Sequence, residues 1–153
     1  MKKTIVALCG ALFAVTATQA FAVDEPANVI KYRKNVMRAM GGHISAIVAV
    51  VKGEVSFTGD VAAHARGINE MSKVAPHIFP QGTDNASQSD TRALPAIWED
   101  PAKFEAAVKA LQDASANLVS VAEAGDPSAF GGALQELGKA CGGCHKPFRA
   151  EKN

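Results

Sequence analysis

The sequence predicts an all-α protein, an antiparallel up-down four-helix bundle, and three observations support this. Apolar residues recur every three or four positions through four long segments, which is the spacing of one helix face. The alternation typical of strands is nearly absent, and alanine is abundant. Short turn signals separate most of the segments, and helices of about 20 to 25 residues joined in this way pack as antiparallel neighbours.

The first 22 residues predict an export signal that is removed from the working protein. Two lysines follow Met1, the run 5–15 is apolar, and Ala20 and Ala22 are the small residues that a signal peptidase reads. We therefore expect cleavage after Ala22 and one domain over residues 23–153, located in the periplasm. The apolar run is too short to span a bilayer, so no membrane partner is expected.

The expected mature chain is almost neutral. It keeps 14 basic and 15 acidic residues once Lys2 and Lys3 are removed, a formal charge of −1. Nucleic-acid binding requires a clustered excess of Lys and Arg, so nucleic acid is excluded as the expected partner.

The first expected helix begins at Pro26 and ends near Gly53. Gly41 and Gly42 fall inside it and each costs about 1 kcal/mol relative to Ala, which predicts the close approach of a neighbouring helix or a bound group. The inward stripe of this helix is Ile30, Arg33, Met37, Met40, Ile44, Ile47 and Val51.

The second helix is expected to begin near Gly59 and to end before Pro76. The third and fourth each begin with Asp followed by Pro, at 100–101 and 126–127, because Asp caps the free amide groups and Pro tolerates the first turn. The inward stripe of the second helix is Val61, His64, Ile68, Met71, Val74 and Ala75. That of the third is Phe104, Val108, Leu111, Ala114, Leu118 and Val121. That of the fourth is Phe130, Leu134, Leu137, Cys141, Cys144 and Phe148.

One connection, residues 79–98, is too long for a simple helix-to-helix turn. It is rich in Gly, Pro, Ser and Asp. Loops of this length in a compact domain are either functional or mobile. Both interpretations stay open: a mobile crossover, or a cover over something bound in the core.

The cysteines are concentrated in one motif, CGGCH at 141–145. The third, Cys9, lies in the expected export signal, and a lipid anchor there is disfavoured because bulky Leu8 precedes it. Zinc would need a second ligand pair, a thiol redox centre would need a preceding strand, and a disulfide across so short a loop would stabilise little. CxxCH is the attachment signature of a c-type haem.

Helix geometry explains the spacing of this motif. Cys141 and Cys144 are three residues apart, so both sulfurs reach one side of a helix and can form thioethers with one edge of a porphyrin. His145 lies one turn beyond Cys141 and can stand beneath the iron. Only eight residues follow His145, so any sixth ligand must come from upstream.

At this point the chain resembles the cytochrome c′ family over essentially all of its expected mature length. The resemblance is carried by "KYRKNVM" in the first helix, "IWEDP" before the third and "CGGCHKPFR" at the end. It implies one haem c attached through Cys141 and Cys144, with His145 as the single protein ligand of a five-coordinate iron.

The resemblance also implies roles for five further residues. Met37 is expected over the vacant face of the haem, and Arg33 near the propionates. A buried guanidinium there would need an anionic partner, and propionates supply two. Arg149 is expected to flank His145, whereas Lys34 and Asp90 are expected at the haem edge.

The implied function is electron transfer with binding of NO and CO, not enzymatic catalysis, in a homodimer formed through the first two helices. Two alternatives remain. One is a six-coordinate cytochrome with Met37 or Met40 as ligand, and the other is a peroxidase, which would need a distal acid and base that Met37 does not supply. His43, His64 and His77 are expected at or near the surface.

Overall fold

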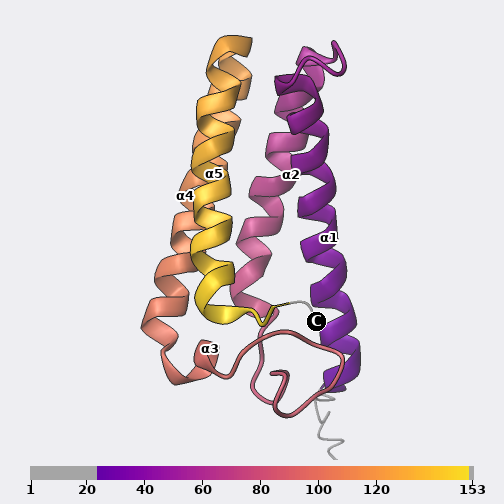
Figure 1. Cartoon of the computed structure of the whole chain (residues 1–153), viewed down its shortest axis with the longest axis vertical. Coiled ribbons are helices and arrows are strands. Elements are labelled where there is room, and N and C mark those ends of the chain that lie inside the picture. The colour runs from indigo at the N-terminus through magenta and orange to yellow at the C-terminus, as the bar shows by residue number, and fades with distance from the viewer. Residues whose placement is uncertain (1–23, 152–153) are drawn as a thin grey trace, which may run out of the picture.

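The structure, a computed structural model, describes residues 24–151 and is helical through most of them (Figure 1). The predicted export signal and its cleavage site lie outside the described residues. The long helices are α1 Pro26–Val51, α2 Val61–Val74, α4 Pro101–Ala124 and α5 Pro127–Phe148, joined by the short α3 Ala96–Glu99 and by the single turns η1 Thr58–Asp60 and η2 Ala75–His77.

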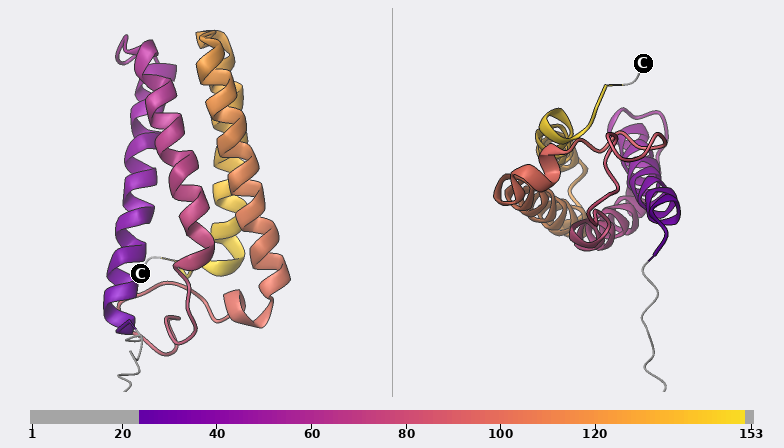
Figure 2. Two further views of the ribbon diagram at one scale, coloured as in Figure 1. Left: turned by 180° about the vertical axis from the view of Figure 1, so that it is seen from behind. Right: turned by 90° about the horizontal axis from the view of Figure 1, so that it is seen from below.

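The four long helices run alternately up and down, which confirms the predicted bundle (Figures 1 and 2). Helix α1 packs on α2, α2 on α4, and α4 on α5, whereas the contact between α1 and α5 is the least extensive of these neighbouring pairs. Among residues 24–151, no helix is both long and apolar enough to cross a membrane.

The predicted helix starts are confirmed in detail. Asp100 accepts a hydrogen bond from the Lys103 amide at 3.1 Å, and Asp126 accepts one from the Ser128 amide at 2.9 Å. Gly125 ends α4 with φ of 74°, a left-handed conformation that glycine adopts without strain. Neighbouring residues therefore determine where α4 ends, at Gly125, and where α5 begins, after Asp126.

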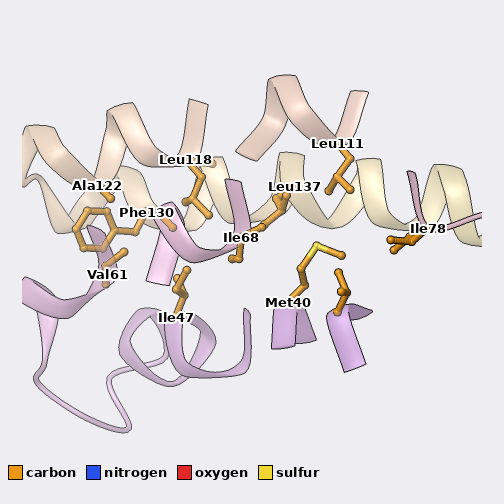
Figure 3. Close-up of a cluster of buried hydrophobic side chains, with 13 residues drawn as sticks. Met40, Ile47, Val61, Ile68, Ile78, Leu111, Leu118, Ala122, Phe130 and Leu137 are labelled. Carbon is orange, nitrogen blue, oxygen red and sulfur yellow. The ribbon is translucent and has the colours of Figure 1, made fainter. Parts of the chain in front are cut away.

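The main core cluster fills the body of the bundle, with contributions from all four long helices (Figure 3). Ile47, Ile68, Leu118 and Leu137 are 0% exposed. The expected stripes shift slightly: Val36 is buried although it was not in the first stripe, and Val51 is 40% exposed at the end of α1.

The expectation that a neighbouring helix approaches Gly41 and Gly42 closely is wrong. Both are exposed, and a side-chain carbon built at either would meet nothing within 4 Å. The close approach occurs instead at Gly67 of α2, where such a carbon would lie 2.6 Å from Nε2 of His43. The glycine that packing requires is therefore in the second helix.

The crossover between η2 and α4 closes the lower end of the bundle, as the view from below shows (Figure 2). It is tied to the end of α5 by an isolated antiparallel bridge between Ala93 and Arg149. The Leu94 amide donates to the Phe148 carbonyl at 3.0 Å, and the Ala150 amide donates to the Arg92 carbonyl at 2.8 Å. This arrangement favours the interpretation of the loop as a cover.

Candidate functional site

The two cysteines of the CxxCH motif lie on the last turns of α5 and remain unbridged thiols. Both are half-buried: Cys141 packs against the main core cluster, and Cys144 against a second cluster at the lower end that includes Phe104 and Phe148. Burial raises the pKa of each thiol, and for Cys144 the neighbouring Cys141 adds to the rise while Arg149 opposes it.

His145, the third residue of the motif, is also half-buried. Burial lowers the pKa of its imidazole, and the positive charges of Arg149 and Arg92 lower it further. A neutral imidazole at pH 7 is the form in which histidine binds metals. Arg92 was missed by sequence reasoning, because only folding of the crossover brings it near His145.

Met37 lies on α1, a neighbour of the helix α5 that carries the motif. It is half-buried and packs against the same core cluster as Cys141, whereas Met40, one turn further along α1, is only 6% exposed. The structure therefore distinguishes the two candidate methionines. Met40 is part of the closed core, and Met37 lies at the partly exposed edge of the same cluster.

Arg33 is 4% exposed and organises the crossover. One terminal nitrogen of its guanidinium donates to Oγ1 of Thr83 at 2.8 Å and to the Ile78 carbonyl at 3.2 Å. The other donates to the Thr83 carbonyl at 2.7 Å and to Oγ1 of Thr91 at 2.8 Å. The guanidinium carbon also lies 4.8 Å from the centre of the Phe79 ring.

Within the described residues, the four hydrogen-bond acceptors of the buried Arg33 guanidinium are neutral hydroxyl and carbonyl oxygens. Thr83 and Thr91 were missed, because nothing in a polar loop marks which of its hydroxyls will turn inward. A propionate contact for Arg33 stays a prediction.

Lys34 and Asp90 are brought together, although 56 positions separate them in the chain. Nζ of Lys34 lies 2.6 Å from Oδ1 of Asp90, and their side chains are 38% and 81% exposed. The hydrogen bond and the charge of Lys34 lower the pKa of the Asp90 carboxyl. The pair is too exposed to stabilise the fold much, but it marks where the crossover meets α1.

Arg149, the last predicted site residue, directly follows α5 and is exposed. Its amide donates to the His145 carbonyl at 3.0 Å, and it is the residue bridged to Ala93. The crossover and the motif are thus physically joined. An open hollow lined by Phe79, Trp98 and Phe104 lies elsewhere at this end and includes none of the predicted site residues.

The residues present fit a covalently attached haem. Two unbridged thiols at helical spacing share the half-buried part of α5 with a neutral imidazole. Among the neighbouring long helices, α1 and α5 pack least extensively, and Met37 of α1 and Cys141 of α5 are only half-buried against the same core cluster. A large apolar group held at the cysteines would cover their exposed surface.

Comparison with known proteins agrees with this geometry. A family model described as cytochrome C′ matches residues 28–149. The chain belongs to the cytochrome c′ family.

Relatives named cytochrome c′ cover nearly the whole chain. The protein from Rhodospirillum rubrum is 37% identical over 144 residues, which are 94% of this chain and 97% of the relative. That from Rhodopseudomonas palustris is 35% identical over the full length of both chains. Among solved structures, cytochrome c′ from Rubrivivax gelatinosus has a TM-score of 0.75 at 29% identity and covers 84% of this chain and 100% of its own.

Family membership establishes the cofactor. Cytochromes c′ carry haem c bound covalently through cysteine, and Cys141 and Cys144 have the required spacing here. Other relatives bear different names, among them a cytochrome c-556 from Agrobacterium tumefaciens that is 34% identical over 127 residues, 82% of this chain and 100% of the relative. Membership of the family therefore establishes haem c as the cofactor. The number of iron ligands has to be inferred from the residues around the haem.

Proposed function

We propose that the protein is a periplasmic c-type haem protein with five-coordinate iron that transfers electrons and binds NO and CO. The observation that carries this proposal is the pairing of a half-buried CxxCH motif on α5 with an apolar α1 face that presents Met37. Haem c supplies an iron that changes oxidation state and binds small gases.

Each residue of the proposed haem site has a separate role. Cys141 and Cys144 hold the cofactor by thioether bonds, so retention does not depend on the metal ligand. His145 supplies that ligand from the next position of α5. Met37 would line the gas-binding side of the site with an apolar side chain that does not coordinate the iron, which would exclude water and still admit small apolar gases.

The arrangement of α1 argues against a peroxidase. Cleavage of peroxide needs an acid and a base positioned beside the iron. Met37 and its buried neighbours Val36 and Met40 can neither donate nor accept a proton. Relatives in the family are cytochromes, and none of those named above is named as an enzyme.

Gas binding is supported by a structural relative. A solved structure is a nitric oxide complex of a variant of cytochrome c prime from Alcaligenes xylosoxidans, with a TM-score of 0.76 at 27% identity, covering 85% of this chain. In this chain we assign the same capacity to the site between Met37 and His145.

At the edge of the site, the crossover and the end of α5 contribute charged groups. We assign Arg33, Lys34 and Arg149 to the neighbourhood of the haem propionates, since these cations, together with Arg92, lie where the crossover meets α1 and α5. Asp90 positions Lys34 through their ion pair. The chain is further proposed to form a homodimer through α1 and α2, which sedimentation of the holoprotein tests.

Attachment and reactivity test the proposal together. Denatured holoprotein should keep its haem colour, replacement of either Cys141 or Cys144 by Ala should weaken retention, and replacement of both should abolish it. The ferrous protein should bind CO and NO, and the ferric protein mixed rapidly with peroxide should form no ferryl species. Haem extractable from the unaltered protein by acidic solvent, or fast ferryl formation, would contradict it.

A further inference from the structure

Two histidines outside the haem motif face each other across the α1–α2 contact. His43 of α1 and His64 of α2 are both half-buried, and their Nδ1 atoms lie 2.9 Å apart. The ring centres are 5.2 Å apart and the planes are inclined by 56°. The pair is separate from the CxxCH motif, because His43 lies about 9 Å further along α1 than Met37.

The His43 ring packs against a glycine of α2, Gly67. The Nε2 edge of the ring lies against α2 at Gly67, where a side-chain carbon would approach Nε2 to 2.6 Å and the adjacent ring carbons to 2.9 and 3.0 Å. A Cβ atom essentially never lies within 3 Å of another side chain's heavy atoms, so any other residue at this position would displace the ring. Gly67 thereby orients His43 with Nδ1 toward His64.

The simplest role of such a pair is one hydrogen bond between neutral rings, in which one Nδ1 donates and the other accepts. The same pair also offers two nitrogen ligands 2.9 Å apart, which can bind one ion when the rings turn toward it. Bonds of about 2.0–2.1 Å from one ion to both nitrogens, at the observed separation of 2.9 Å, give an angle at the ion near 90°. Tetrahedral Zn²⁺ would need the nitrogens about 3.3 Å apart.

We propose that His43 and His64 form a binding site for a divalent transition-metal ion that prefers right-angled nitrogen ligation, Cu²⁺ or Ni²⁺. Square-planar and tetragonal nitrogen sites are those of Cu²⁺ and Ni²⁺, and Cu²⁺ binds such ligands most tightly of the first-row divalent ions. The hydrogen bond between the rings gives way to two metal–nitrogen bonds, and the proton of the donor ring moves from Nδ1 to Nε2, so that both rings stay neutral.

The site is open rather than closed. In the part of the chain that the structure describes, no third His, Cys, Asp or Glu completes a cluster with this pair. Water therefore fills the other positions around the ion. An ion held by two ligands exchanges more readily than one in a closed site, which suits reversible binding better than a structural role.

The test uses ferric holoprotein, which has no haem electron to give to Cu²⁺. Calorimetric titration with Cu²⁺ should give one ion per chain, and electron paramagnetic resonance of the copper should show coupling to two nitrogens. His43→Gln and His64→Gln should each weaken binding at least tenfold. Gly67→Ala should also weaken it while leaving both ligands in place. His77→Gln, which alters an exposed histidine, should bind Cu²⁺ like the unaltered protein.

Circular dichroism and haem content confirm that each variant is folded. If one histidine variant does not fold, the copper affinity of the other variant and the nitrogen coupling in the unaltered protein still test whether both histidines bind the ion. The proposal is overturned if the unaltered protein binds no Cu²⁺, or if copper binds with equal affinity when either histidine is replaced. Tighter binding of Zn²⁺ than of Cu²⁺ would overturn the right-angled geometry.

Discussion

The body of the bundle and its lower end are built by different means. In the body, side chains such as Ile47, Ile68 and Leu118 are fully buried against one another. At the lower end, the residues of the motif are only half-buried, and the crossover is held by the polar contacts of Arg33. In the body, side chains alone fill the core. At the lower end, the half-buried residues of the motif leave apolar surface that the haem would cover.

Two methionines one turn apart on α1 make the sharpest test of this difference. Met40→Ala should lower the free energy of unfolding by about 2–4 kcal/mol, because it empties space in the closed core. Met37→Ala should cost less than about 2 kcal/mol, since that side chain is only partly buried, but it should speed binding of CO and NO. Denaturant titration and flash photolysis of the holoproteins measure the two effects. If Met40→Ala and Met37→Ala lower the free energy of unfolding equally and Met37→Ala leaves the rates of CO and NO binding unchanged, the two methionines do not have different roles.

The role assigned to Arg33 predicts a smaller, localised effect. Arg33→Met removes the donors to Thr83 and Thr91, and we expect a loss of about 2 kcal/mol, since each buried hydrogen bond to a charged group contributes about 1.5–3 kcal/mol and the hydroxyls can partly rearrange. Hydrogen exchange should accelerate at the Leu94 and Ala150 amides, which pair the crossover with α5.

The matched variant Arg33→Lys keeps the charge but loses the forked geometry, so it should restore little of that protection. Amides around Leu118 in the body should exchange as before. Unchanged protection at Leu94 in Arg33→Met would mean that the crossover is held by other contacts.

The smallest expected effect is a pH dependence at Asp84 in the crossover. Burial raises the pKa of its carboxyl, but hydrogen bonds from the backbone and hydroxyl of Ser87 and the backbone of Ala86 outweigh it, and the net pKa is lowered. A lowered folded pKa stabilises the protein above the ordinary value of about 3.9, and this contribution is lost as the pH falls through the folded pKa.

The thermal midpoint of the unaltered protein should therefore exceed that of Asp84→Asn at pH 6, and the gap should close toward pH 2.5. Melting of both proteins followed by circular dichroism across this range measures it. A gap that stays constant with pH would assign the effect to packing rather than to charge.

The sequence predicted those parts of the molecule that depend on local chemistry. Helical periodicity, the two Asp-Pro starts and the CxxCH spacing each act within a few residues, and the structure confirms the resulting bundle and helix ends. The unpredicted features are contacts across the chain. Arg33 meets Thr83 and Thr91, Arg92 approaches His145, and the close glycine is Gly67 rather than Gly41, because a one-dimensional pattern does not specify which faces meet.

The coordination of the iron tests the central claim most directly. Ferric holoprotein at neutral pH should give the absorption and electron paramagnetic resonance of high-spin or mixed-spin iron, because the proposed function makes His145 the only protein ligand and gives Met37 no bond to the iron. A purely low-spin spectrum with a methionine-to-iron charge-transfer band, lost in Met37→Ala, would contradict the account and establish a six-coordinate cytochrome.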